Sequence, residues 1–128
     1  MAIFRVPALW LATRFKDYFF GNLISAVEHY DKQPYRDWRT DFVGKEGLII
    51  LYESEHKAPG KIFFHMLVGV GRWMYCTVGD WEPGGEKDTI ITRNSIYTFT
   101  RQHNLSREEK QVLLERAAAS GRIPGDNK

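Results

Sequence analysis

The first part of this 128-residue sequence carries apolar side chains at the spacing of a helix. Between Thr13 and Asp31, positions three or four apart are apolar, which is typical of an amphipathic helix with one buried stripe. Thr13 is suited to be its N-cap. Residues 3–11 are expected to form a short strand or extended arm, which Pro7 places at the edge of a sheet. The stripe consists of Phe15, Phe19, Leu23, Val27 and Tyr30.

From residue 47 onward the pattern changes to short apolar or alternating runs, which predict strands. Arg93-Asn94 predicts a tight hairpin turn, because Asn tolerates positive φ. Residues 79–87, which contain Pro83-Gly84-Gly85, predict an exposed loop. The charged segment 31–46 is expected to be irregular, with Tyr35 and Trp38 as anchors. The predicted strands span 47–54, 61–70, 72–78, 88–92 and 95–101.

A second helix is expected near the C-terminus. Ser106-Arg107-Glu108-Glu109 forms a capping box, and Gly121 followed by Pro124 is a helix stop. Residues 121–128 are expected to be a frayed tail. Short connections favour antiparallel pairing, so the fold class is α+β in a single domain over 1–128. We predict a mostly antiparallel sheet of about five strands, flanked by an N-terminal and a C-terminal helix.

Composition narrows the functional classes. Eighteen basic and sixteen acidic residues give a net charge of +2, which does not favour a nucleic-acid-coating surface. The single cysteine, Cys76, cannot form an intramolecular disulfide and is expected to be a small buried hydrophobe. No stretch is long enough to span a bilayer, and no signal peptide is expected. The reduced cytoplasm is the expected compartment, and no membrane partner is expected.

Motifs for catalysis or metal binding are not legible. The four histidines, His29, His56, His65 and His103, do not pair at ligand spacing, so no metal or cofactor is expected. Asp31, Asp37 and Asp41 share one segment, where they are either an acid–base group or ordinary turn residues. Gly69-Val70-Gly71 predicts a strand bend, because no helix follows it as in a dinucleotide fingerprint. We therefore expect no enzymatic activity.

Aromatic and arginine side chains are the more informative signal. Aromatic residues make up 14% of the chain, and several stand near arginines. Flat rings and guanidinium groups suit a nucleotide, through stacking on the base and bonding to phosphate. The alternative is that the rings form the core while the arginines are solvated. Trp81, in a predicted polar loop, is a candidate lid or interface residue.

The hairpin Thr92-x-Asn94-Ser95-x-Tyr97 resembles the first family of Thoeris anti-defence proteins, which are small phage-encoded sheet-and-helix oligomers. The resemblance covers about a fifth of the chain. It implies a homo-oligomer that sequesters a cyclic nucleotide signal in the host cytoplasm without cleaving it. Arg93 and Asn94 would then bond the ligand at the hairpin tip. Tyr97 or Trp81 would stack on a base, and Arg72 or Arg101 would meet phosphate.

Three functions stay open at this stage. The first is a non-enzymatic protein that sequesters a nucleotide-type immune signal. The alternative is an inhibitor or adaptor that binds a host protein, of the anti-restriction or anti-CRISPR type. A second alternative is a nucleotide-processing enzyme. Oligomer size, strand order and the identity of the partner cannot be derived from these patterns.

Overall fold

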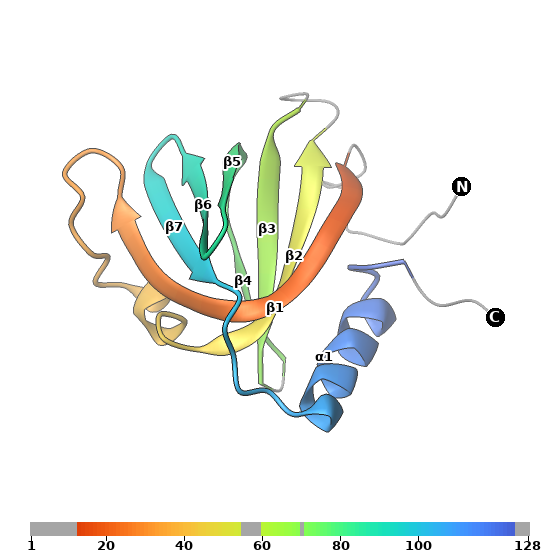
Figure 1. Ribbon diagram of the computed structural model, residues 1–128. Helices are drawn as coiled ribbons and strands as arrows, with labels where there is room; N and C mark the ends of the chain where they lie inside the picture. The colour runs from red at the N-terminus through yellow and green to blue at the C-terminus, as the bar shows by residue number, and fades with distance from the viewer. Residues whose placement is uncertain (1–12, 55–59, 70, 125–128) are drawn as a thin grey trace.

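The computed structural model describes residues 13–54, 60–69 and 71–124. The predicted arm at 3–11, His56, Val70 and the last residues of the predicted tail, 125–128, lie outside this part. Figure 1 shows strands curling around a common interior, with one α-helix against their outside. The elements are β1 (Thr13–Glu28), the 3₁₀ helix η2 (Trp38–Asp41), β2 (Glu46–Ser54), β3 (Ile62–Val68), β4 (Arg72–Tyr75), β5 (Gly79–Gly84), β6 (Lys87–Thr92), β7 (Ser95–Thr100) and α1 (Arg107–Ala119).

The strands form a closed barrel. All pairings are antiparallel, and the order is β2-β1-β7-β6-β5-β3; β5 pairs with β3 at Ile62, and β4 pairs with β3 from His65 to Val68. A pairing between β2 and β3 closes the circle into six strands. The expected α+β fold, with five strands between two helices, is therefore wrong. Closure removes most free strand edges, which a flat sheet would leave exposed.

The predicted N-terminal helix is a long bent strand. β1 pairs with β2 along its first half and with β7 along its second half, so it crosses the lower end of the barrel in Figure 1. Gly21 lies beside Asn22, where β1 changes partner, and a Cβ atom at Gly21 would come within 2.3 Å of the Thr100 carbonyl oxygen. Phe19, Leu23 and Ala26 fill the interior. Inward side chains of a strand normally recur every two residues. In β1 the inward position 21 is a glycine and a bulge lies between Leu23 and Ser25, so the inward apolar residues recur every three or four positions, as in a helix.

The predicted loop at 79–87 also contains a strand, β5, which pairs with β6. Its Pro83-Gly84-Gly85 signal marks only the end of the strand and the turn, where Gly85 has a φ of +76°. Trp81 lies opposite Ile90 and packs against the interior cluster. The ring therefore faces the core and is no lid.

The interior of the barrel and the layer beneath α1 are two separate clusters. In β2 and β3, alternate side chains point inward, as Ile49 and Phe64 do, or outward, as Ile50 and Leu67 do. The outward side chains are buried because α1 covers this side of the barrel through Leu113 and Ala117. Continuous apolar runs in these two strands follow from burial on both faces.

The predicted hairpin turn and the predicted start and end of the C-terminal helix are confirmed. The turn after β6 lies at Arg93-Asn94, and Ser106 and Glu109 form the capping box of α1. Gly121 ends the helix with a φ of +77°. Beyond it the chain is still packed, because Ile123 is 7% exposed beneath α1's end. The described part of the predicted tail, 121–124, thus contributes Ile123 to this layer.

The connection between β1 and β2, residues 29–45, packs against the barrel. Its backbone bonds to the second half of β1, with Tyr35 donating to the Ala26 carbonyl at 3.2 Å and Gly44 to Leu23 at 2.7 Å. Phe42 enters the interior cluster and Tyr35 packs against it. This connection is thus ordered by the barrel itself.

Candidate functional site

The six residues expected to bind a ligand do not converge on one hollow. Arg93 and Asn94 form the turn between β6 and β7, whereas Arg101 follows β7 at the opposite end of this hairpin. Trp81 lies on β5, opposite Ile90 in the middle of β6. Arg72 begins β4, and Tyr97 points into the barrel. The predicted nucleotide site is therefore not assembled by these side chains.

Trp81 and Arg101 both contact the ring of Phe19. The Arg101 guanidinium lies 4.2 Å above the Phe19 ring, and the Trp81 ring centroid is 6.1 Å from it. Arg101 Nε donates to Asp88 Oδ2 at 2.8 Å, and the Asp88 side chain is only 3% exposed. The pair neutralises a buried carboxylate, which explains both residues as supports of the barrel.

The hairpin turn is bound to the 29–45 connection through backbone atoms. The Asn94 carbonyl accepts the His29 N–H at 2.8 Å and the Tyr35 hydroxyl at 3.0 Å. Tyr97, with 2% of its surface exposed, accepts a hydrogen bond from Arg39 Nε at 3.0 Å. These contacts fasten the connection to the barrel, while the side chains of Arg93 and Asn94 are exposed.

An aromatic and arginine surface does exist, on this connection and the neighbouring start of β4. We call it the Trp38 surface and define it by Trp38, Arg39, Asp41 and Arg72. Arg39 Cζ lies 3.9 Å from the Tyr35 ring centroid and 4.9 Å from that of Trp38. Arg72 Nη2 lies 3.3 Å from Asp41 Oδ2, with both side chains more than half exposed.

Trp38 is held in place but not covered. Its ring packs edge-on against Phe42, with centroids 6.3 Å apart, and the Arg39 guanidinium covers one part of it. Asp37 caps η2 by accepting the Arg39 N–H and also pairs with the Arg39 side chain. Trp38 nevertheless remains 48% exposed. The sequence marked it only as an anchor, because its charged neighbours hide the ring from any apolar pattern.

The three aspartates considered as an acid–base group have separate structural roles. Asp37 caps η2, Asp41 pairs with Arg72, and Asp31 accepts the Gln33 N–H at 3.0 Å. Each is a turn or cap residue, which is the second of the two interpretations that the sequence allowed.

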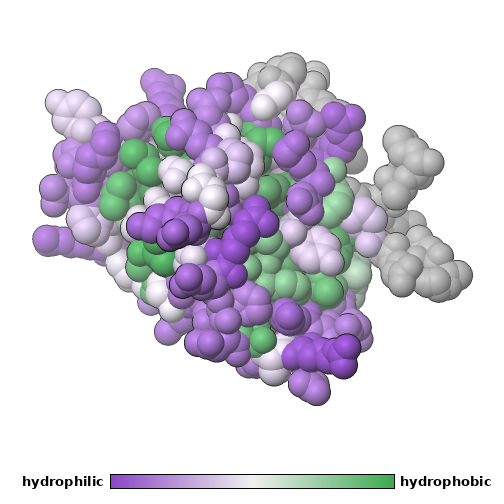
Figure 2. Space-filling view, viewed as in Figure 1, coloured by the Kyte–Doolittle hydropathy of each residue, from purple (hydrophilic) through white to green (hydrophobic). Residues whose placement is uncertain are grey.

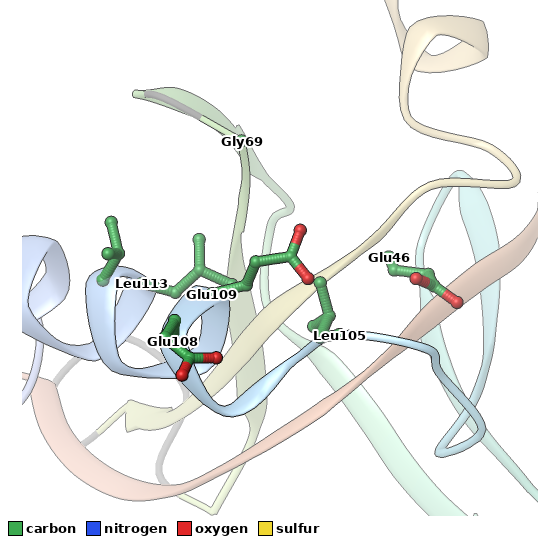
Figure 3. Close-up of a pocket in the computed structure, with 7 residues that line it drawn as sticks. Glu46, Gly69, Leu105, Glu108, Glu109 and Leu113 are labelled. Atoms are coloured by element: carbon green, nitrogen blue, oxygen red, sulfur yellow. The ribbon is translucent and has the colours of Figure 1, made fainter.

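A groove lies beside the N-terminus of α1. Its volume is about 500 Å³, and Gly69, just after β3, stands at its edge. Figure 3 shows Glu108 and Glu109 on one side of Leu105 and Glu46 on the other side. We call it the α1 groove. Its side chains are Glu46, Leu105, Glu108, Glu109, Val112 and Leu113.

A second hollow of about 380 Å³ lies at the end of β1 and the start of the 29–45 connection. Polar and charged residues with one proline line it, and none of the six predicted ligand residues is among them. They are Glu28, Asp31, Gln33, Pro34 and Arg36.

Two side chains with reactive chemistry lie in packed surroundings: Cys76 is half-buried and His65 is 1% exposed. Burial raises the pKa of the Cys76 thiol to about 12, which keeps it protonated. Burial, and then the Arg122 guanidinium, lower the pKa of His65 to about 3. His65 lies among the rings of Tyr52, Tyr75 and Phe63 at centroid distances of 4.6, 4.6 and 5.7 Å. Neither group is presented to a substrate in the described structure.

Within residues 13–54, 60–69 and 71–124, no cluster of three or more His, Cys, Asp or Glu side chains could hold a metal ion. In the same part of the chain, no helix has the length and apolar character needed to cross a membrane. Comparison with protein families, curated proteins and solved structures found no match to this chain.

Proposed function

We propose that this chain is a non-enzymatic domain that binds a protein partner through the Trp38 surface. The observation that carries the proposal is the position of Trp38: fixed by Arg39 and Phe42, yet 48% exposed. Trp, Tyr and Arg are the residue types that carry most binding energy at protein interfaces. Binding to a host protein as an inhibitor or adaptor is the class of function that this surface supports.

The surface is also ordered before any partner arrives. Tyr35 and Phe42 pack on the barrel interior, and Arg39 is bonded to Tyr97, so the ring of Trp38 stands on a rigid base. A side chain held in place before binding loses little conformational entropy on association. Arg72 and Asp41 are exposed charges at the margin, where they suit the polar rim of an interface.

A protein fits this arrangement better than a nucleotide does. Small ligands bind in concave sites that bury most of their surface. The described hollows are lined by other residues, and Trp38 lines neither of them. The residues expected to bind a nucleotide lie apart, with Arg93 and Asn94 at the β6–β7 turn and Arg101 beyond the other end of β7.

Replacing the ring tests the proposal. In quantitative pull-downs from source cells, the wild-type bait should retain a partner that Trp38→Ala loses, with affinity of the purified pair reduced at least about 30-fold. Tyr30→Ala is the matched control, since Tyr30 is 96% exposed on the same connection. It should leave affinity within about threefold. Calorimetric titration of the purified pair measures both.

Equal retention of every partner by wild type and Trp38→Ala would contradict the proposal, as would turnover of a nucleotide by the wild-type chain. Sedimentation velocity distinguishes a further case. If the wild type is an oligomer that Trp38→Ala dissociates, the surface binds a second copy of this chain and no other protein is required.

A further inference from the structure

The α1 groove combines an apolar floor with an acidic rim. Leu113 is 4% exposed at its base and Leu105 is partly buried, while Val112 is 46% exposed beside them. Glu46, Glu108 and Glu109 supply three carboxylates, and the lining contains no basic side chain. Its volume of about 500 Å³ falls in the range of about 300–1,000 Å³ that is usual for binding sites.

Helix capping accounts for only part of this acidity. Acidic residues are favoured in the first turn of a helix, which explains Glu108 and Glu109. It does not explain Glu46, which begins β2 on the other side of Leu105 (Figure 3). Nor does it explain why Val112 is left open to solvent. Two structural elements therefore contribute negative charge around the same apolar floor.

Two of the carboxylates are fixed in position by the backbone. Glu46 Oε2 accepts the Asn104 N–H at 2.8 Å, and Glu109 Oε1 accepts the Ser106 N–H at 2.7 Å. In each case the second oxygen is not used by that bond and can accept from a ligand. The described carboxylates do not form a cluster that could hold one metal ion, so the rim suits cations that are spaced apart.

We propose that the α1 groove binds a cationic amphipathic segment of a partner protein. Lysine or arginine side chains of that segment bond to Glu46, Glu108 and Glu109, while its apolar side chains cover Val112 and Leu105. Complementary charge selects the segment and sets its register, and burial of the apolar side chains holds it. The nearby Lys110 does not line the groove, and its Nζ lies over the Phe20 ring at 5.6 Å from the centroid.

A labelled peptide of about 12 residues that alternates Lys and Leu on a helical pattern tests the groove by fluorescence anisotropy. Glu108→Lys and Val112→Ser should each weaken binding at least about fivefold. Glu115→Lys is the matched control on the same helix, outside the groove, and should change affinity less than about twofold. Both substituted groove residues are exposed, and circular dichroism confirms that each variant is folded.

The peptide panel separates specific docking from general attraction. A Lys/Ser peptide without apolar side chains and a Glu/Leu peptide without cations should each bind at least about tenfold more weakly than Lys/Leu. Equal binding of Lys/Ser, an equal loss in Glu115→Lys, or no binding of Lys/Leu would each overturn the proposal. So would a dimer of the wild type that Glu108→Lys dissociates, because the occupant would then be a second copy.

This proposal stands apart from the Trp38 surface. Trp38→Ala should bind the Lys/Leu peptide as the wild type does, and Glu108→Lys should keep the partner that depends on Trp38. Failure of one proposal therefore leaves the other intact.

Discussion

The two halves of the barrel wall share one interior but differ in what covers their outside. In β2 and β3 nearly every side chain is buried, whereas in β6 and β7 buried positions alternate with half-exposed ones. The difference is α1, which packs mainly over β2 and β3. Figure 2 shows green hydrophobic residues on both sides of this face of the molecule, between purple hydrophilic ones. Burial of an outward side chain is thus decided by the neighbouring layer.

The same contrast indicates where recognition is to be expected. Rings on the strands, such as Tyr97, Trp81 and Tyr52, are used to fill the interior or the layer beneath α1. Both proposed surfaces instead lie on segments that connect or follow strands, at Trp38 and at the start of α1. Connections on a rigid scaffold are common positions for binding residues.

The largest expected effect on the free energy of unfolding comes from truncating an outward isoleucine to alanine on each half of the barrel wall. Ile50→Ala, beneath α1 and 0% exposed, should lower the free energy of unfolding by about 2–5 kcal/mol, because it leaves a cavity. Ile96→Ala, outward on β7 and half-exposed, should cost less than about 1.5 kcal/mol. Urea denaturation measures both. Equal losses would show that α1 does not distinguish the halves.

Acid should weaken the helix-covered half through His65. Its folded pKa of about 3 lies below the ordinary value of 6.5, because burial and Arg122 oppose the charged form. Stability is therefore full above the unfolded pKa and is lost as the pH falls toward the folded one, by up to about 1.4 kcal/mol per pH unit. His65→Phe should flatten this slope between about pH 6.5 and 4.5.

The control is His29→Gln, a substitution beside the β6–β7 turn. This variant should keep the dependence of stability on pH that the wild type shows. Unfolding titrations at a series of pH values give the slopes directly. A slope that is the same in wild type and His65→Phe would contradict the assignment.

Removing Arg101 should lower the free energy of unfolding, because the buried carboxylate of Asp88 on β6 loses its ion-pair partner. Arg101→Ala leaves Asp88 without its main partner and should cost about 1–3 kcal/mol, reduced from a fully buried pair because water reaches the half-exposed guanidinium. Arg72→Ala, whose partner Asp41 is exposed, should cost less than about 1 kcal/mol. A double-mutant cycle with Asp88→Asn isolates the pair. Equal losses of stability in Arg101→Ala and Arg72→Ala would contradict the assignment of Asp88 as a buried carboxylate that depends on Arg101.

The smallest effect is expected at the cap of α1. Ser106→Ala removes the hydroxyl that accepts the Glu109 N–H at 3.0 Å and should cost about 1 kcal/mol. Amide exchange in α1 and in the outward-facing layer beneath it should quicken together. Ser106→Asp should retain the cap and the slow exchange. No change in exchange with Ser106→Ala would indicate that α1 is held by packing alone.

The sequence predicted much of the second half of the chain but misread the first. The strands predicted at 47–54, 61–70, 72–78, 88–92 and 95–101 each overlap a strand of the structure. The hairpin turn and the capping box are present as well, since these depend on neighbouring residues. The strand β1 was predicted as a helix because Gly21 and a bulge disguise its period of two. The candidate surfaces were largely missed. Trp38 had been marked as an anchor, but the α1 groove joins residues as distant as Glu46 and Val112.

Local chemistry accounts for caps, turns and runs of apolar residues, because a few adjacent side chains and backbone groups settle each of them. Barrel closure, the bend of β1 and the choice of which rings stay exposed depend on contacts between distant segments. Pairing of β1 with both β2 and β7 is one such contact, and it overrides the helical spacing of Phe15 to Tyr30. Long-range packing has no signature within a short window, so it emerges only when the chain is folded.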